Sequence, residues 1–423
     1  MIVRQKYLDE LIAFKDCDLI KVVTGMRRCG KSTLLDMMAD HLMRMNVPPE
    51  RIFMFKMESM EYAGLADYKK LYAKVIEEVA HVEHPYLFFD ELQEVLGWEI
   101  AINALRVDLE CDIYITGSNA YLLSSELSTK LSGRYVEIHM LPLTFEEYLE
   151  FKGANWYSKE DRQRDLVTFN DGGFSTLASM LEDYRRFGGL PYLALQETNQ
   201  AHHKAYMKTL YDTVLIRDIM ERDRRRDRRQ LKSPELLERI ALFLADNIGN
   251  ENSINKMAGA LRAEKMESAN NTVAAYIGAL CESYLFYPCR RYDIKGKENL
   301  KTGGKHYIVD VGIRNYLQGY RDSDQGRVLE NIVYLQLLYD GYEASIGKLR
   351  AGEVDFVATR DGETLYIQVT EDMSDQSTME RELAPLFAIR DAHPKMVVVA
   401  KGSYPANIDG VKIVKIEDFL LHR

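Results

Sequence analysis

The chain has 423 residues, of which 46% are hydrophobic and 28% are charged, and its 55 basic against 65 acidic residues give a net charge of −10. This length predicts two or three domains, and the acidic balance excludes a global basic field for nucleic acid, so any such contact needs a local patch. No apolar run reaches the length of a membrane span, residues 1–6 lack the apolar core of a signal peptide, and the five cysteines have no metal-ligand spacing. We therefore expect a cytoplasmic protein.

A glycine-rich loop lies between a predicted strand and a predicted helix. Apolar residues 19–24 form the strand, residues 25–32 read GMRRCGKS, and residues 33–42 have the composition of a helix. In this context G-x-x-x-x-G-K-S is the phosphate-binding loop of nucleoside triphosphatases, because its glycines let successive backbone N–H groups point at a β-phosphate. The positive end of the helix adds to the attraction. We predict that ATP is bound by Gly25, Arg27, Arg28, Cys29, Gly30, Lys31, Ser32 and Thr33.

Two residues of the loop and two later acids have predicted catalytic roles. Lys31 would reach the β- and γ-phosphates, and the Ser32 hydroxyl would ligate Mg²⁺. The apolar run 86–89 ends in Asp90 and Glu91, which is the pattern of a Walker B strand. Asp90 would hold the magnesium through water, and Glu91 would polarise the attacking water as a general base. Without the loop, an ordinary strand that ends in a charged turn would explain this run equally well.

Another strand, residues 111–115, also ends in polar residues. Ligands of a doubly wound sheet bind beyond the carboxyl ends of its strands, so Thr116, Ser118 and Asn119 should lie beside Asp90. Either Ser118 or Asn119 is expected to hydrogen-bond the γ-phosphate or the attacking water, as a first sensor. Because Ser and Asn also favour helix N-caps, a capping role is the alternative.

Arg134 precedes a fifth predicted strand, residues 135–138. It is a candidate to stabilise phosphoryl charge, either in cis or from a neighbouring subunit, with a plain surface arginine as the alternative. Further on, Thr144 and Glu147 form a capping box that opens the next helix.

Taken together, several of these segments resemble one family of ATPases. They are GMRRCGKST, LFFDELQ, ITGSN, LSGRY and LPLTFEEYL, and residues 188–191 and 216–219 are similar to the family's intervening motifs. The family is that of the AAA-type bacterial and archaeal ATPases whose C-terminal half carries a domain of unknown function. The resemblance covers essentially the whole chain. It implies an additional-strand, catalytic-glutamate P-loop core, a winged-helix segment and a degenerate nuclease-like end.

Two arginine-containing segments follow the predicted ATPase core. Arg185 and Arg186 precede the Gly-Gly-Leu-Pro break at residues 188–191, and they act either as a second sensor or as solvated helix arginines. Residues 222–229 hold six arginines and two aspartates. The interspersed acids favour an exposed, ion-paired segment over a contact with a phosphate backbone.

Residues 233–311 show three helices and then two strands, which is the order of a winged helix. The third helix has no Lys or Arg between residues 272 and 286, which argues against readout of DNA bases. The basic residues lie in the wing instead, and they are Arg290, Arg291, Lys295, Lys297, Lys301 and Lys305. Non-specific phosphate contact and packing against a protein partner both fit this pattern, and we favour packing.

The end of the chain resembles the restriction-endonuclease-like fold with a PD-(D/E)xK motif. In active members an acid on the first helix, an Asp in a hairpin and a Glu-x-Lys on the next strand bind Mg²⁺ and position a water. Glu330 and Asp355 match this pattern, but Gln368 and Thr370 stand where the Glu and the Lys belong. A neutral amide is a poor ligand for Mg²⁺, so we expect no cleavage activity.

The predicted fold is an α/β P-loop NTPase with a parallel sheet, followed by a helical and winged-helix region and a restriction-endonuclease-like α/β domain. The predicted domains are an AAA-type ATPase at 1–150, a helical extension at 151–232, a winged helix at 233–322 and an inactive nuclease-like domain at 323–423. The predicted function is a slow, Mg²⁺-dependent ATPase whose nucleotide state moves the last two domains. One alternative is an ATP-regulated DNA nuclease, in which Lys348 or Glu371 migrates into the site, and another is a nucleotide-binding scaffold without turnover. Expected partners are ATP and ADP, a protein or a second copy of the chain, and DNA through the wing, but no membrane.

Overall fold

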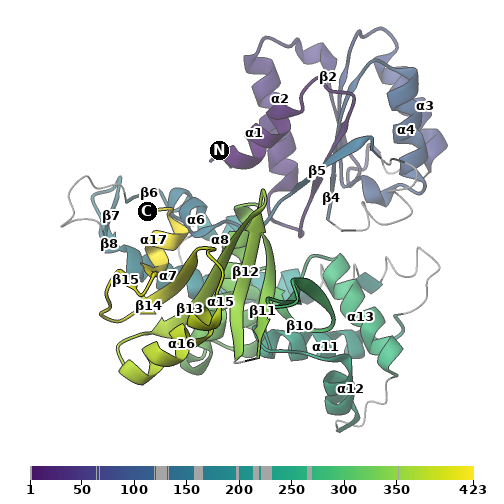
Figure 1. Ribbon diagram of the computed structural model, residues 1–423. Helices are drawn as coiled ribbons and strands as arrows, with labels where there is room; N and C mark the ends of the chain where they lie inside the picture. The colour runs from purple at the N-terminus through teal and green to yellow at the C-terminus, as the bar shows by residue number, and fades with distance from the viewer. Residues whose placement is uncertain are drawn as a thin grey trace. The chain divides into compact units, whose positions relative to one another are not determined.

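A computed structural model describes residues 2–62, 64–65, 67–118, 120, 131, 133–156, 165–196, 200–212, 219–220, 231–263, 269–350 and 352–423. The chain forms two compact units (Figure 1). The first unit is Met1–Leu141 with Glu282–Tyr284, and the second is Pro142–Cys281 with Leu285–Arg423. Among the described residues, none of the helices combines the length and the apolar character that crossing a bilayer requires.

The first unit is built on a parallel five-stranded sheet in the order β2-β3-β4-β1-β5. Its strands are β1 Ile20–Thr24, β2 Ile52–Lys56, β3 Tyr86–Asp90, β4 Asp112–Gly117 and β5 Tyr135–His139. Its helices are α1 Gln5–Ala13, α2 Lys31–Arg44, α3 Tyr68–Val79 and α4 Trp98–Asp108, with single turns η1 Pro49–Arg51 and η2 Leu92–Glu94. Helices α1 and α2 lie on one side of the sheet and α3 and α4 on the other (Figure 1). The predicted α/β fold with a parallel sheet is therefore confirmed.

The sequence forms this sheet because its central strands are continuous apolar runs. Every residue of β1 and of β4 is buried, as expected of parallel strands with helices on both faces. Strand β4 lies between β1 and β3, which is the position of the additional strand. Parallel pairing also brings the carboxyl ends of β1, β3 and β4 to the same edge of the sheet, where the candidate site lies.

The second unit contains a mixed eight-stranded sheet in the order β10-β9-β11-β12-β13-β14-β16-β15 and a small sheet of β6, β7 and β8. The large sheet consists of β9 Phe286–Asp293, β10 Glu298–Ile308, β11 Glu343–Leu349, β12 Gly352–Arg360, β13 Glu363–Asp372, β14 Lys395–Lys401, β15 Asn407–Ile408 and β16 Val411–Lys415. The small one consists of β6 Ala154–Asn155, β7 Leu166–Phe169 and β8 Phe174–Thr176. The described helices are α6 Phe145–Phe151, α7 Leu177–Phe187, α8 Pro191–Ala194, α9 Gln200–Thr209, α11 Pro234–Asp246, α12 Ile254–Ala263, α13 Asn270–Glu282, α14 Val311–Gln318, α15 Gln325–Tyr339, α16 Gln376–Ala388 and α17 Ile416–Leu420, with the turn η6 Asp322–Asp324.

The hairpin expected as the wing, β9 and β10, is part of the same sheet as the C-terminal strands. Strand β9 pairs in parallel with β11, and Ile346 lies opposite Arg291. The sheet thus joins strands that we assigned to two predicted domains, 233–322 and 323–423. Because of this pairing, side chains of the hairpin can reach the face of the C-terminal strands.

The two faces of this sheet are covered by different helices. Leu329 and Val333 of α15 share an apolar cluster with Phe356, whereas Leu383 of α16 belongs to another cluster with Val354. The pairing of β11 with β12 shifts by one residue between Val354 and Val357, which is a β-bulge. The bulge contains Asp355, the predicted carboxylate of the nuclease-like pattern.

Candidate functional site

The glycine loop of the first unit connects β1 to α2 in the arrangement that the sequence predicts. Gly25 has φ 138°, and a Cβ atom on it would lie 2.2 Å from the carbonyl oxygen of Met140, so no other residue fits there. Gly30, at φ 105°, is the N-cap of α2 and leaves the first turn of the helix without a side-chain cap. The N–H groups of that turn are therefore available to an anion.

Lys31 is held at the centre of the loop. Its side chain is 3% exposed, and Nζ donates to the carbonyl oxygens of Gly25 at 3.1 Å and Met26 at 3.0 Å. The ammonium also lies 3.8 Å from Oε1 of Glu91. The two carbonyls and the carboxylate balance a charge that burial would otherwise disfavour.

Asp90 at the end of β3 is linked to both neighbouring strand ends. The Ser32 hydroxyl donates to its Oδ1 at 2.9 Å, and the Thr116 hydroxyl donates to the same atom at 2.6 Å. Thr116 in turn accepts the backbone N–H of Glu91 at 2.9 Å. The structure therefore brings together the hydroxyl and the carboxylate predicted to hold magnesium, and it gives Thr116 a positioning role that the sequence did not specify.

Glu91 is the most constrained acid of the site. Its backbone has φ 55°, a left-handed conformation that is costly for a residue with a side chain. Its carboxylate accepts hydrogen bonds from Gln93 and from the Ser118 hydroxyl, the latter at 2.8 Å. Burial disfavours ionisation, but the charges of Lys31 and Arg27 and these hydrogen bonds outweigh it, so the pKa of Glu91 lies below its usual value. Glu91 is thus ionised at neutral pH, as a general base must be.

The remaining loop residues are not equally close to this centre. Cys29 is fully buried, and burial raises the pKa of its thiol. Arg27 pairs with the exposed Glu58 at 3.2 Å, whereas Arg28 and Thr33 are exposed. Arg28 has φ 68° within the loop, and Thr33 follows Ser32 in the first turn of α2.

Arg134 is not brought to this edge of the sheet. It directly precedes β5, where its carbonyl accepts the N–H of Ile20 at the amino end of β1. Its guanidinium donates to Oδ1 of Asn103 at 3.1 Å. About five residues of strand separate this end of the sheet from the glycine loop, which is on the order of 15 Å. Asn119, the other uncertain catalytic candidate, lies outside the described residues, as do residues 222–229.

Arg4 supports the loop from the N-terminal segment and was not predicted. It is buried, and its guanidinium donates to the carbonyl oxygens of Cys29 at 3.1 Å and Leu141 at 2.7 Å. It ties the loop to the chain that follows β5. No local pattern identifies such a residue, because its partners lie far away in the sequence.

The two acids that we predicted from the nuclease-like pattern meet around a lysine of the hairpin formed by β9 and β10. Lys305 on β10 is 5% exposed, and its Nζ lies 2.9 Å from Glu330, 2.7 Å from Glu353 and 3.7 Å from Asp355. The Tyr307 hydroxyl adds a hydrogen bond to Glu330 at 2.6 Å. We call Lys305, Glu330, Glu353 and Asp355 the Lys305 cluster. The predicted pair Glu330 and Asp355 thus shares one ammonium.

Gln368, which stands where the metal-binding carboxylate was expected, forms one accepted and one donated hydrogen bond. Its Oε1 accepts the N–H of Asp355 at 3.3 Å, and its Nε2 donates to Oε2 of Glu382 at 2.9 Å. Burial and the neighbouring Glu330 hold the pKa of Asp355 well above its usual value, although Lys305 opposes them. Within the described ranges, no group of three His, Cys, Asp or Glu residues is arranged to hold a metal ion.

Arg185, the candidate second sensor, is a structural residue of the second unit. Its guanidinium pairs with both oxygens of Glu371, at 3.2 and 2.7 Å, and donates to the carbonyl of Gln325 at 3.1 Å. Glu371 was the acid that the nuclease alternative would bring to the site of Glu330 and Asp355. In the structure its carboxylate is paired with Arg185 instead.

Comparison with known proteins identifies two domains along the chain. Residues 18–149 match an AAA domain, and residues 178–324 match a domain of unknown function. A protein of Haemophilus influenzae, described as uncharacterized, is 36% identical over 422 residues, which are 100% of this chain and 99% of that protein. The uncharacterized protein MJ1544 of Methanocaldococcus jannaschii is 28% identical over 412 residues, with coverage of 94% and 85%. The prediction of an AAA-type ATPase domain followed by a domain of unknown function is confirmed.

Solved structures are similar to the chain at low identity. The Walker-type ATPase PABY2304 of Pyrococcus abyssi has 14% identity and a TM-score of 0.49, over 75% of this chain and 96% of that chain. The RuvB Holliday junction branch migration motor of Thermotoga maritima has 14% identity and a TM-score of 0.31, over 68% and 89%. AMPPCP-bound DnaA of Aquifex aeolicus has 14% identity and a TM-score of 0.28, over 67% and 90%.

Proposed function

Since the chain belongs to the same family as the Haemophilus influenzae protein and carries an AAA domain, we propose that it is an Mg²⁺-dependent ATPase with slow turnover. The observation that carries this proposal is the convergence of four side chains at one edge of the sheet. Lys31, Ser32, Asp90 and Glu91 are linked there by contacts of 2.9 Å between Ser32 and Asp90 and 3.8 Å between Lys31 and Glu91. This is the set of charges that a magnesium-bound triphosphate requires.

Each residue of this set has a distinct role in the proposed reaction. The uncapped turn of α2 and Lys31 bind the phosphates, and Lys31 exchanges its loop carbonyls for phosphate oxygens. Ser32 and Asp90 would hold Mg²⁺, which neutralises charge that develops on the phosphates. Glu91 takes up the proton of the attacking water, and Ser118 and Gln93 fix the orientation of its carboxylate.

Release of phosphate from ATP tests the proposal directly. We expect wild-type protein to release phosphate only with Mg²⁺, Lys31→Ala to lose both binding and release, and Glu91→Gln to bind ATP without release. Ser118→Ala should lie between wild type and Glu91→Gln. If Glu91→Gln released phosphate at the wild-type rate, the protein would be a nucleotide-binding scaffold. If Lys31→Ala bound ATP as tightly as wild type, the nucleotide site itself would be wrong.

The placement of Arg134 argues against a role in its own chain's site, and leaves either a surface arginine or a role from a neighbouring copy of the chain. In its own chain it lies at the amino end of the sheet, far from the phosphates. We propose that Arg134 stabilises the charge on the phosphoryl group bound to a neighbouring copy of the chain. Because this requires association of the copies, the rate of turnover per chain should rise with protein concentration. Mixing Lys31→Ala with Arg134→Ala should restore activity that neither variant has alone, because one mixed interface has both residues intact.

The five cysteines of the chain are all free, which fits a reducing cytoplasm.

In this proposal the nucleotide state moves the second unit, whose nuclease-like centre does not cut DNA. The Lys305 ammonium contacts both Glu330 and Asp355, and Gln368 stands in the place of the third acid. The gathering of Glu330 and Asp355 nevertheless favours a nuclease as a second candidate. Nicking of supercoiled DNA in Mn²⁺, lost in Asp355→Asn, would establish the nuclease. Fluorophores placed one in each unit would report an ATP-dependent movement.

A further inference from the structure

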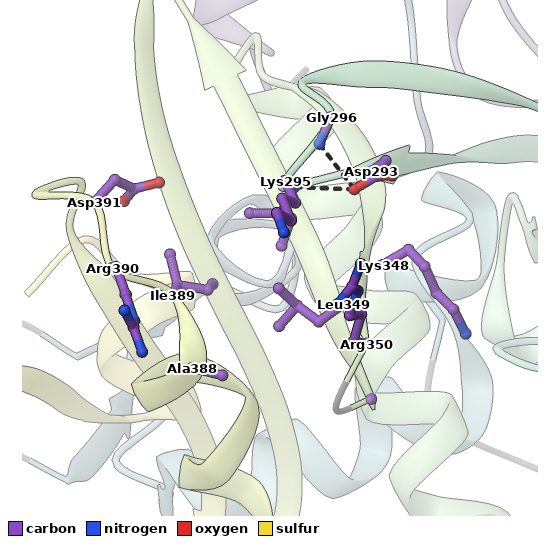
Figure 2. Close-up of a pocket in the computed structure, with 12 residues that line it drawn as sticks. Asp293, Lys295, Gly296, Lys348, Leu349, Arg350, Ala388, Ile389, Arg390 and Asp391 are labelled. Carbon is purple, nitrogen blue, oxygen red and sulfur yellow. Dashed lines mark hydrogen bonds between the residues drawn. The ribbon is translucent and has the colours of Figure 1, made fainter.

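A large pocket of the second unit is lined by charges of both signs. It has a volume of about 1420 Å³, and the exposed cations Lys295, Arg350 and Arg390 share its lining with Asp293 and Asp391 (Figure 2). Cations and aspartates that line the same space weaken each other's field. The pocket therefore does not indicate one class of ligand.

The first unit includes one short segment from the later part of the chain. Among the described residues after Leu141, only Glu282–Tyr284 belong to it, and the residues on either side of this segment belong to the second unit. The segment contains the last residue of α13 and is followed by β9, which begins at Phe286. A displacement of these three residues is therefore passed along the chain to a helix and a strand of the second unit.

Tyr284 follows the end of α13 in an unfavourable backbone conformation. Its φ is 58°, and the backbone N–H of Leu285 donates to the carbonyl oxygen of Leu280 at 3.1 Å. This is the hydrogen bond of a Schellman motif, in which glycine is the usual left-handed residue because it has no Cβ atom. A bulky residue with such a φ is costly, which indicates that its side chain has a role of its own.

The side chain of Tyr284 is packed against strand β5. Tyr284 is 7% exposed, its hydroxyl donates to Oε1 of Glu137 at 3.4 Å, and its ring centroid lies 4.6 Å from that of His139. Burial and the neighbouring Glu137 raise the pKa of Tyr284, so the hydroxyl keeps its proton and remains a donor. Tyr284 and both of its partners belong to the first unit.

The same two residues of β5 contact the end of β1. The hydroxyl of Thr24, directly before the glycine loop, donates to Oε1 of Glu137 at 2.6 Å and lies 3.0 Å from Nδ1 of His139. The carbonyl of Thr24 accepts the N–H of Met140 at 2.8 Å. Burial and the charge of Lys31 lower the pKa of His139 to about 4, so its ring is neutral at pH 7 and lies near the loop lysine.

We propose that Tyr284 positions the glycine loop and transmits its nucleotide state to α13 and β9. This inference rests on the proposed ATPase function and names the contact through which ATP acts on the second unit. When Lys31 exchanges the carbonyls of Gly25 and Met26 for phosphate oxygens, the start of the loop loses these two hydrogen bonds. Gly25 is packed against the carbonyl of Met140, so a shift of the loop displaces the strand ends that hold Tyr284. Tyr284 then moves the turn after α13.

Hydrogen exchange of the full-length protein, with and without Mg²⁺ and ATP at a concentration that calorimetry shows to be saturating, tests the proposal. In the wild type, ATP should change exchange in the loop, residues 20–32, and also in residues 270–286, there by at least about fivefold, the lower end of usual coupling between sites. Tyr284→Gly removes the side chain and relieves the backbone. It should keep the response of the loop and reduce that of residues 270–286 to less than about twofold.

Two further variants separate the contact from the turn. His139→Ala removes the ring partner without altering the turn, and it should lose the response of residues 270–286 as Tyr284→Gly does. Tyr284→Phe keeps the ring contact, and its response should lie between those of the wild type and the glycine variant. Lys297→Gly is the matched control, because Lys297 is exposed and has φ 54° in the turn between β9 and β10. It should respond as the wild type does, and circular dichroism shows whether each variant is folded.

The outcomes separate this inference from the proposed ATPase function. The role of Tyr284 is overturned if the wild-type loop responds to ATP but residues 270–286 do not. It is also overturned if Tyr284→Gly and His139→Ala keep the wild-type response, or if Lys297→Gly loses it as well. If the wild-type loop itself does not respond to ATP, the nucleotide site is wrong, and the proposed function fails together with the inference.

Discussion

Removal of the Lys305 ammonium tests how the Lys305 cluster is held together. In Lys305→Met the carboxylates of Glu330, Glu353 and Asp355, which lie 2.9, 2.7 and 3.7 Å from Nζ, lose their common counter-ion. The Glu353 side chain is 28% exposed and can be solvated, whereas that of Asp355 is 14% exposed and keeps only the backbone N–H of Val369 as a described hydrogen-bond donor to its carboxylate. Breaking a buried ion pair costs about 3–5 kcal/mol, so we expect a loss of this size at pH 7.

The loss of stability in Lys305→Met should depend on pH, because the substitution changes the pKa of Asp355. Burial and Glu330 already raise the pKa of Asp355, and Lys305 is the charge that lowers it, so its removal raises that pKa further. A carboxyl group whose pKa is higher in the folded than in the unfolded state lowers the free energy of unfolding as the pH rises from the unfolded pKa to the folded pKa. At low pH the group is protonated in both states, so this penalty is absent. The loss in Lys305→Met should therefore shrink as the pH falls from 7 toward 5.

The tryptophans of the chain make this measurement specific to one unit. The sequence has two of them, Trp98 in the first unit and Trp156 in the apolar cluster under α15. In a Trp98→Phe background, urea unfolding followed by Trp156 fluorescence reports the second unit alone. Lys297→Met, an exposed lysine of the same hairpin, should change stability by less than about 0.5 kcal/mol. A loss below about 1 kcal/mol at pH 7, or the same loss at pH 5, would refute the reasoning.

Three further predictions concern single positions. Gly25→Ala places a Cβ 2.2 Å from the Met140 carbonyl oxygen, and calorimetry should show ATP affinity reduced by about 1–3 kcal/mol or more. Thr116→Val leaves the buried backbone N–H of Glu91 without its acceptor. Phosphate release measured at fixed times should show that the activation barrier of ATP hydrolysis is raised by about 1–3 kcal/mol, whereas the affinity for ATP should change less. Burial raises the pKa of Asp310 to about 6 despite hydrogen bonds from backbone N–H groups, so its ionised form disfavours the folded state. Wild-type stability should therefore fall relative to Asp310→Asn as pH rises from about 4 to about 6, by at most about 3 kcal/mol in urea unfolding, and a difference independent of pH would contradict this.

The geometry of the candidate nucleotide site was the most predictable part of the molecule, because the residues that form it are close together in the sequence. The loop has glycine at Gly25 and Gly30, where φ is 138° and 105°, and the lysine and the hydroxyl follow within two residues of Gly30. The acids at the end of β3 were predictable for a related reason, since a buried strand that ends in Asp90 and Glu91 must present them at its carboxyl end. Thr116 and Ser118 were placed near them by the same rule.

The position of Arg134 was predictable from that rule as well. A residue that precedes a strand of a parallel sheet lies at the amino end, opposite to the phosphate loop, and residues 135–138 were already identified as a strand. In contrast, nothing local identifies Arg4, because its carbonyl partners belong to Cys29 and Leu141. The Lys305 cluster shows the same limit, because its four charges come from β10, α15 and β12 and meet only through the pairing of β9 with β11.

The glutamine at residue 368, where the nuclease-like pattern has a glutamate, is matched by a hydrogen bond to Glu382. The Gln368 amide donates to Glu382 at 2.9 Å, so a glutamate at residue 368 would place two carboxylates in contact. Like charges at that distance inside a protein cannot both be ionised without a cation between them. Lys305 contacts Glu330 and Asp355, and the cation that contacts Glu382 is Arg381, at 2.8 Å from Oε1, the carboxylate oxygen that Gln368 does not contact. The Gln368 side chain therefore bonds to both neighbours, because its Oε1 accepts the backbone N–H of Asp355 and its Nε2 donates to the carboxylate of Glu382.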